Sequence, residues 1–208
     1  MKYIYLHGFA SSPASRKAQF FAGKLRAEGC TVEIPALESE GFRNLTITGQ
    51  LNVIAAATAG ENAVRLIGSS LGGYLAALFA SRETRVDRLV MLAPAFGFAE
   101  RWVDRLGEDK MRQWRDDGYL EMFHYAGGQP EAVGYGLIED GLGYPAEPSV
   151  HQPAQIFHGL QDDVVPVEFS RHYAARHAHV QLTELDSGHE LTDVMEEIWT
   201  LSRDFLLG

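Results

Sequence analysis

The sequence lacks the features of several protein classes. Its 208 residues include a single cysteine, Cys30, so no internal disulfide can form. No apolar run approaches the length of a membrane span, and the residues after Met1 show no signal-peptide pattern. Positive charge is scarce, and the net charge of −10 disfavours nucleic acid and anionic membranes as partners. We therefore expect a soluble, cytoplasmic protein that binds neither nucleic acid nor a membrane.

Metal-ligand clusters and internal repeats are also missing. His172, His177 and His179 lie close together, but only His172 and His179 have the spacing of one helix face. Residues 68–73 are rich in glycine, yet no lysine follows them as a phosphate-binding loop requires. We expect no metal and no organic cofactor. The sequence leaves the oligomeric state open.

What the sequence does contain is a regular alternation of strand-like and helix-like segments. Strand-like segments lie at residues 2–6, 31–34, 64–67, 86–92, 154–157 and 180–185, and residues 64–67 form a short apolar run typical of a buried strand. Helical patterns lie between or after them: one starting at Ser12-Pro13, one over 45–59 capped by Asn44, then 74–81, 167–176 and 191–206. This alternation predicts one α/β domain over residues 1–208, with a mostly parallel six-stranded sheet between two layers of helices.

The segment 68–72, G-S-S-L-G, fits the pattern G-x-S-x-G with Ser70 at its centre. An apolar run precedes it and a helical pattern follows, which is the strand–turn–helix context of a nucleophilic serine. Glycines at 68 and 72 leave room for a sharp turn, and the helix start directs free N–H groups toward the serine. The Leu71 N–H is then placed to stabilise an oxyanion. The alternative interpretation is an ordinary Gly-Ser turn.

Polar residues follow other predicted strands. Asp162 comes after the strand at 154–157, and His189 after the strand at 180–185. Because functional groups gather at the carboxyl ends of parallel strands, Ser70, Asp162 and His189 are expected to meet. Their chain order, serine then aspartate then histidine, is typical of an α/β-hydrolase triad.

The whole chain resembles a small α/β-hydrolase, and its opening resembles the YqiA/YcfP-type bacterial esterases. The opening reads Tyr5-Leu6-His7-Gly8-Phe9, followed by Ser11-Ser12-Pro13 and Ser15-x-Lys17. The pattern His158-Gly159-x-x-Asp162-x-x-Val165-Pro166 is similar to the acid loop of the wider superfamily, and Gly188-His189 to its histidine loop. The resemblance implies a second oxyanion donor in the loop after the first strand, where Phe9 N–H matches best.

Several alternatives accompany these candidate residues. Asp163 follows the same strand as Asp162, but the His-Gly-x-x-Asp spacing favours Asp162; Asp186 lies close to His189 in sequence and is a weaker candidate. His7 and His158 are expected to be structural residues bonded to nearby backbone, and Ser69 a packed neighbour of the serine. Arg16 and Lys17 are expected to form a solvated basic face rather than an anion site.

Residues 97–148 form a long insertion between the fourth and fifth predicted strands. In this fold such a segment commonly forms a helical cap over the serine. It contains 11 acidic and 5 basic residues, so it carries −6 of the net charge of −10, which argues against a strongly anionic substrate. Its eight aromatic Phe, Trp and Tyr residues are mostly expected to form the core of the cap, with a few lining an apolar acyl pocket.

These observations predict a serine hydrolase that cleaves small carboxylic esters of short to medium acyl chains, or thioesters, through an acyl-enzyme. His189 would act as the base for Ser70, and Asp162 would orient His189. The same fold and triad also serve amide, lactone or carbon–carbon bond cleavage. A non-catalytic binding protein of this fold is the remaining alternative.

Overall fold

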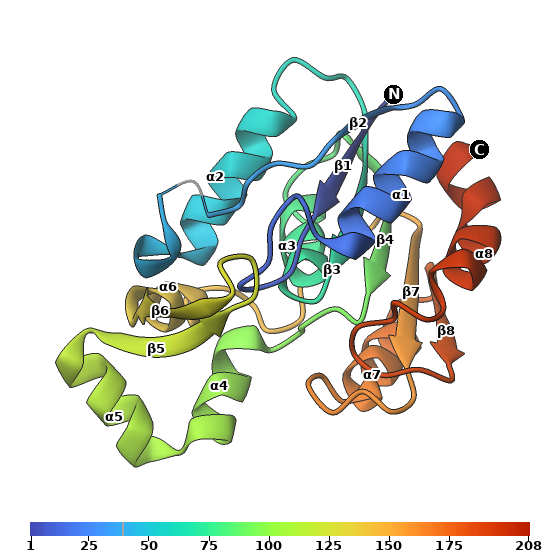
Figure 1. Cartoon of the computed structure of the whole chain (residues 1–208). Helices are drawn as coiled ribbons and strands as arrows, with labels where there is room; N and C mark the ends of the chain where they lie inside the picture. Colours follow the sequence, from blue (N-terminus) through green and yellow to red (C-terminus); the bar gives the residue numbers. More distant parts are fainter. Residues whose placement is uncertain (39) are drawn as a thin grey trace.

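The computed structural model of this protein describes residues 1–38 and 40–208. Its central sheet has six strands in the order β2-β1-β3-β4-β7-β8, and every neighbouring pair is parallel (Figure 1). The strands are β1 (Lys2–Leu6), β2 (Thr31–Glu33), β3 (Val64–Ser69), β4 (Val86–Leu92), β7 (Ala154–Gly159) and β8 (Val180–Leu185). The predicted six-stranded parallel sheet is confirmed.

Helices cover both faces of this sheet. One face carries α1 (Arg16–Ala27) and α8 (Met195–Leu207); the other carries α2 (Ile47–Ala57), α3 (Leu71–Ala80) and α7 (Val167–Arg176). Strand β1 shows the alternation, since Ile4 and Leu6 belong to one buried cluster and Tyr3 and Tyr5 to the other. The inner strands β1 and β3 are buried on both faces and are therefore apolar on both sides, whereas the edge strands β2 and β8 carry exposed and polar residues.

Two predicted helix starts were wrong. Helix α1 begins after Ser15, whose hydroxyl accepts a hydrogen bond from the Ala18 N–H, whereas Ser12 bonds the N–H of Ala14 in a local turn. Helix α2 begins after Thr46, whose hydroxyl accepts from the Gly49 N–H. A residue caps a helix only where its side-chain oxygen reaches the free N–H groups of the first turn, and several candidates in each loop compete for that position.

The helices beside the strand ends also differ from their predicted bounds. Helix α3 starts at Leu71, immediately after Ser70, rather than at residue 74. Helix α8 starts at Met195 rather than at residue 191, because Leu191 has a φ of 51° and so cannot belong to a right-handed helix. The direct passage from Ser70 into α3 brings the N–H groups of the helix start to the serine.

The insertion forms a mixed cap, not the helical cap that was predicted. It consists of α4 (Phe98–Leu106), α5 (Glu108–Asp117), the antiparallel hairpin β5 (Tyr119–His124) and β6 (Gln129–Gly134), and α6 (Gly136–Gly141) (Figure 1). Gly107 and Gly118, both with positive φ, end the two helices and turn the chain. The break at Gly107 explains why the apolar residues of this region follow no single helical face.

Most of the cap aromatics belong to a buried core, as expected. Trp114 is 1% exposed and its indole N–H donates to the carbonyl of Val133 at 3.0 Å. Tyr119, Phe123 and Tyr125 are the exceptions, since they are 41%, 50% and 76% exposed on the hairpin. Among the described residues, no helix is both long and apolar enough to cross a membrane.

Candidate active site

Ser70 occupies a strained turn between β3 and α3. Its φ is 54° and its ψ is −117°, a conformation that L-residues rarely adopt. Four backbone hydrogen bonds hold it: its N–H donates to the Leu92 carbonyl at 2.8 Å, and its own carbonyl accepts from Gly73, Tyr74 and Ala95. Strain of this kind persists only where the surroundings over-determine the conformation, and it is typical of functional sites.

Two glycines make the turn possible because the backbone passes too close for side chains. A Cβ atom on Gly68 would overlap the backbone of Gly72, and a Cβ on Gly72 would overlap the Leu6 carbonyl at the end of β1. Neither neighbour is the end of a flexible side chain, so neither clash can relax without moving the sheet or the turn.

We therefore expect Gly72→Ala to lower the free energy of unfolding by about 3 kcal/mol, because the added methyl group is forced into backbone. Gly23→Ala in α1 is the matched control: nothing lies within 4 Å of the added Cβ, and removing a helical glycine should stabilise the protein by roughly 0.5–1 kcal/mol. Urea unfolding measures both. An equal change in the free energy of unfolding of the two variants would mean that the turn tolerates a side chain.

The structure brings Ser70, Asp162 and His189 together. The Ser70 Oγ lies 3.1 Å from His189 Nε2, and His189 Nδ1 lies 2.7 Å from Asp162 Oδ2. The three residues follow β3, β7 and β8, so the sheet brings together side chains that are far apart in sequence. With Nδ1–H donating to the carboxylate, Nε2 is free to accept the serine proton.

Asp162 is held as a carboxylate from several directions. Its Oδ1 accepts from the N–H groups of Val164 and Val165 at 2.9 and 2.7 Å, while Oδ2 faces both His189 and, at 3.2 Å, His158. Burial alone would raise the pKa of Asp162, but the hydrogen bonds from His158, His189 and Val165 outweigh it and hold the pKa well below its usual range. These hydrogen bonds therefore favour the charged form of Asp162.

The other two acidic candidates do not reach His189. Asp163 is exposed, and Asp186 is exposed and accepts a hydrogen bond from the Gln161 amide at 2.6 Å. The choice of Asp162 from the His-Gly-x-x-Asp spacing therefore agrees with the geometry.

His158 has a closer relation to the candidate triad than sequence reasoning indicated. It is fully buried; its Nε2 lies 2.8 Å from the Val165 carbonyl and 3.2 Å from Asp162 Oδ2, and its Nδ1 lies 2.7 Å from the Ser170 hydroxyl. One neutral tautomer satisfies all three, with Nε2–H donating and Nδ1 accepting. His158 therefore joins the acid loop to α7 and orients Asp162. The four-residue spacing from His158 to Asp162 was the available signal.

The loop after β1 lies against the serine. A Cβ placed on Gly8 would come within 3.4 Å of the Ser70 Cβ, so Phe9 follows directly at the site. His7 holds this loop as expected: its Nδ1 lies 3.0 Å from the Gly8 carbonyl and its Nε2 accepts from the Leu37 N–H. Burial lowers the pKa of His7, which keeps the ring neutral. Among the described residues, the N–H groups of Phe9 and Leu71 have no hydrogen-bond partner.

Four aromatic side chains pack together beside this loop, and we call them the aromatic wall. The Phe9 ring packs against Phe42, Phe98 and Trp102, with ring centroids 5.2 to 6.1 Å apart. Phe98 and Trp102 come from cap helix α4, so the cap supplies apolar surface next to the serine. The hairpin tip closes the same side, because the Ala126 N–H donates to the carbonyl of Ala10 in the loop after β1.

Arg101 links the cap to the acid loop. Its guanidinium donates to the Val164 carbonyl and lies 5.3 Å from the centre of the Phe169 ring. Burial lowers the pKa of Arg101, and the negative charge of Asp162 partly opposes this change. Helix α4 is thereby tied to the loop that carries the candidate acid.

Comparison with known families matches residues 2–206 to the uncharacterised protein family UPF0227. This chain is a member of that family. No curated protein matches the chain at a significant level.

Solved structures show that the UPF0227 chain has the α/β-hydrolase fold. Alpha/beta hydrolase domain-containing protein 10 from mouse superposes with a TM-score of 0.83 at 18% identity, over 99% of this chain and 89% of that one. Est1E from Butyrivibrio proteoclasticus, solved with ferulic acid bound, gives a TM-score of 0.84 at 19% identity, over 99% and 88%. MGS-MChE2, an alpha/beta hydrolase enzyme from the metagenome of Mar Chica lagoon sediments in Morocco, gives 0.67 at 17% identity, over 99% and 90%.

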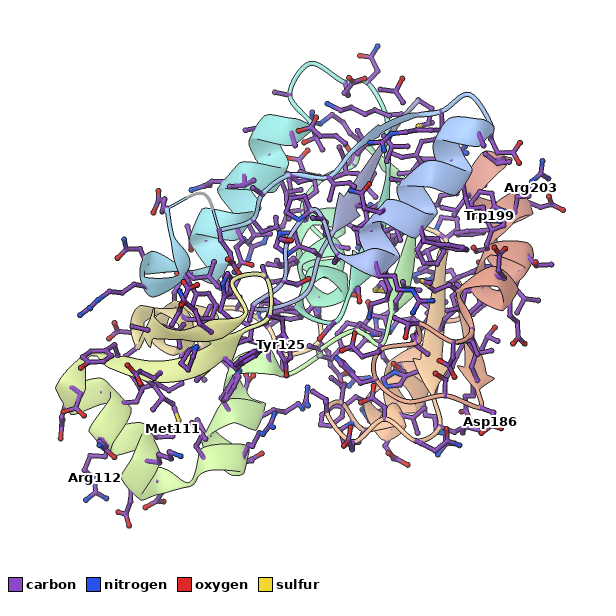
Figure 2. The ribbon with its side chains drawn as sticks, in the orientation of Figure 1. Met111, Arg112, Tyr125, Asp186, Trp199 and Arg203 are labelled. Carbon is purple, nitrogen blue, oxygen red and sulfur yellow. The ribbon has the colours of Figure 1, made fainter. Side chains whose placement is uncertain are left out.

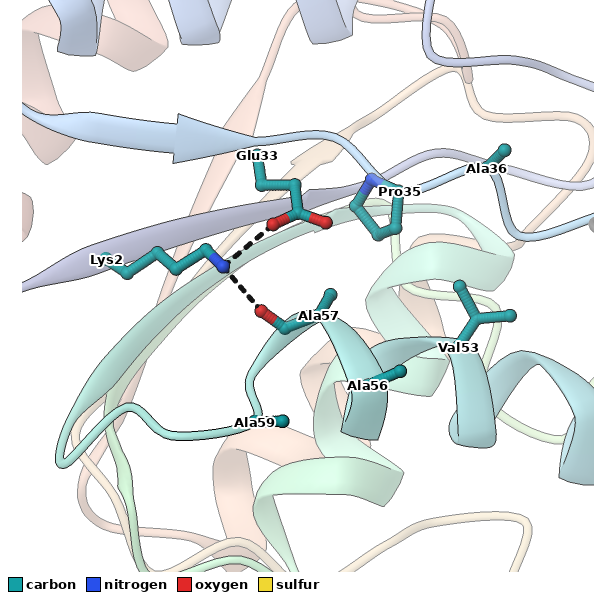
Figure 3. A pocket seen from close by; sticks show the side chains of 8 residues that line it. All are labelled: Lys2, Glu33, Pro35, Ala36, Val53, Ala56, Ala57 and Ala59. Carbon is teal, nitrogen blue, oxygen red and sulfur yellow. Dashed lines mark hydrogen bonds and ion pairs between the residues drawn. The ribbon is translucent and has the colours of Figure 1, made fainter.

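The UPF0227 protein also has a surface hollow of about 440 Å³ away from the serine. It lies between β2 and α2 and is lined by Lys2, Glu33, Pro35, Ala36, Val53, Ala56, Ala57 and Ala59 (Figure 3). The Lys2 ammonium lies 2.7 Å from both Glu33 Oε2 and the Ala57 carbonyl, so its charge is already satisfied. Within residues 1–38 and 40–208, no group of three or more potential ligands is arranged to hold a metal ion.

Proposed function

We propose that this UPF0227 protein is a serine hydrolase that cleaves carboxylic esters through an acyl-enzyme. The observation that carries the proposal is the continuous hydrogen-bonded chain from Ser70 Oγ through His189 to Asp162. A serine hydroxyl is a weak nucleophile at neutral pH and needs an adjacent base. His189 supplies that base. The intact contact between Ser70 and His189 favours an enzyme over a non-catalytic binding protein.

The reaction proceeds in two halves. Ser70 Oγ attacks the ester carbonyl while His189 Nε2 takes its proton; His189 then gives that proton to the departing alcohol, leaving an acyl group on Ser70. Water, deprotonated by His189, attacks the acyl carbonyl and releases the acid and free Ser70. Asp162 stays ionised throughout, since its low pKa suits it to stabilise the imidazolium without accepting the proton.

Charge on the tetrahedral intermediates needs separate stabilisation. The N–H groups of Leu71 and Phe9 are the proposed oxyanion donors, because both lie next to Ser70 and neither is bonded elsewhere among the described residues. Losing one such donor typically raises the barrier by roughly 3–4 kcal/mol.

The acyl group is proposed to lie against the aromatic wall. Phe9 and Trp102 are only partly buried, so their rings can contact a short or medium acyl chain extending from Ser70. Thioesters present the same carbonyl to the same groups and fall within the proposal. The chemistry requires neither a metal nor an organic cofactor, because proton transfer and charge stabilisation both come from this chain.

A fluorophosphonate probe and a series of p-nitrophenyl esters test this proposal. We expect one covalent adduct, mapped by mass spectrometry to Ser70 and not to its neighbour Ser69, together with turnover of short and medium acyl esters. Rates at background for every chain length, combined with an unlabelled protein, would contradict the proposal and favour a binding role.

A further inference from the structure

Two residues of the opening motif, Tyr5 and Lys17, have no part in the mechanism above, yet they converge beside the triad. Lys17 lies in the first turn of α1, and its Nζ is 3.6 Å from Oε2 of Glu190, the residue that follows His189. The Lys17 side chain is only 11% exposed. The prediction of a solvated basic face at this position was therefore wrong.

Two hydrogen-bond donors in this cluster, those of Tyr5 and Lys17, have no partner within hydrogen-bonding distance among the described residues. The Tyr5 hydroxyl is fully buried and has no hydrogen-bond partner among the described residues. Burial raises the pKa of Tyr5, the nearby Ser69 hydroxyl lowers it, and the charge of Glu190 raises it further, which places Tyr5 in the same cluster. The Lys17 ammonium likewise donates no hydrogen bond to a described residue, since 3.6 Å is too long for one.

Holding an ammonium group in this place has a cost. Burial lowers the pKa of Lys17, and the negative charges of Glu190 and Asp162 only partly oppose that change. A buried cation with one loose and 75% exposed carboxylate partner is poorly explained as a stabilising ion pair. Perturbed ionisable groups beside catalytic side chains are instead typical of functional positions.

The position of Lys17 relative to His189 decides which part of a substrate it would meet. His189 Nε2 protonates the departing alcohol, so the alcohol part of the ester must lie next to His189. Glu190 directly follows His189 and its carboxylate lies 3.6 Å from the Lys17 ammonium, so a group extending from that alcohol toward Glu190 would approach this cation. The protein has a net charge of −10, so an anionic substrate needs such a local cation to offset the overall repulsion.

We propose that Lys17 is a specificity residue that binds a carboxylate on the alcohol part of the ester. The proposal rests on the serine-esterase function proposed above and names its substrate class. Glu190 competes with the substrate carboxylate for the same ammonium, and its exposed side chain is free to move aside when the substrate binds.

Paired aryl acetates test this inference. The anionic probes are 3- and 4-acetoxybenzoate, and the neutral probes are their methyl esters. The measured quantity is the ratio of kcat/KM for anionic over neutral probe in each variant, so that the intrinsic reactivity of each ester cancels between variants. We expect Lys17→Met to lower this ratio by about 10- to 100-fold for at least one isomer, as the loss of a charge-assisted hydrogen bond predicts.

Two further variants sharpen the test. Glu190→Gln should raise the ratio, because it removes the competing carboxylate and keeps Lys17. Lys24→Met is the matched control: Lys24 lies on the same helix but pairs with Glu196 at 2.7 Å, away from the triad, so the ratio should stay at the wild-type value. The inhibition constant of 4-hydroxybenzoate against that of its methyl ester gives a second readout that depends on binding alone.

The outcomes separate this inference from the proposed function. If the ratio is the same in wild type, Lys17→Met and Glu190→Gln while Ser70 is labelled and the neutral esters are cleaved, Lys17 does not select an anion and this inference is overturned. An equal loss of kcat/KM for the anionic and the neutral probe in Lys17→Met would mean that Lys17 holds the His189 loop in place instead. If neither probe is cleaved and Ser70 is unlabelled, it is the serine-esterase function that fails. If Lys17→Met does not fold, the kcat/KM ratio of Glu190→Gln and the inhibition constants still test whether Lys17 binds the substrate carboxylate.

Discussion

Replacing Ser70 with alanine should lower kcat for p-nitrophenyl acetate by about 10⁶-fold, close to the background rate, because no other group can form the acyl-enzyme. Labelling by the fluorophosphonate probe should disappear at the same time. The aromatic wall is untouched by the change, so if it binds the acyl group as proposed, a competitive, non-covalent apolar inhibitor should still bind.

Ser81→Ala is the matched control for this prediction. Ser81 follows α3, the helix that begins after Ser70, and its hydroxyl donates only to the Leu78 carbonyl at 2.8 Å. This variant should keep the wild-type kcat. A Ser70→Ala protein that retains kcat within about tenfold of wild type would remove Ser70 from the mechanism.

Replacing Asp162 with asparagine should lower kcat by about 10⁴-fold while leaving the fold intact. The carboxylate now accepts from His189 Nδ1–H at 2.7 Å. Because Oδ1 accepts from two backbone N–H groups, an asparagine would keep its oxygen there and place its NH₂ group at the Oδ2 position, facing both His189 and His158; the His189 ring must then carry its proton on Nε2. The imidazole could then no longer accept the proton of Ser70.

Asp163→Asn separates this effect from a general change in charge. Asp163 is the next residue and is exposed, so the variant loses the same charge from the same loop without touching His189. We expect its kcat to match wild type. If Asp163→Asn impaired turnover as strongly as Asp162→Asn, the assignment of the acid from the hydrogen bonds would be wrong.

The cap illustrates what local pattern could and could not predict. The insertion was found from its length and its aromatic content, and the burial of Trp114 agrees with the expected cap core. The hairpin of β5 and β6 was missed because β6, Q-P-E-A-V-G, contains a proline and only two apolar residues, so it gives a weak strand pattern beside β5. Figure 2 shows Tyr125 beside this hairpin.

The sequence by itself determined the parallel α/β sheet and the chemistry proposed for its edge. Strand and helix periods are local properties, and the carboxyl ends of parallel strands must meet at one edge, so Ser70, Asp162 and His189 could be placed together before any coordinates. The role of glycines 68 and 72 could also be predicted from the sequence, because only a sharp turn requires them at that spacing.

Only the tertiary structure decided which other side chains surround the candidate catalytic residues at that edge of the sheet. His158 contacts Asp162 and Ser170, and Lys17 is buried against Glu190, a residue from the opposite end of the chain. Burial and long-range pairing depend on how whole elements pack, and a single histidine or lysine looks the same in sequence whether it is solvated or enclosed.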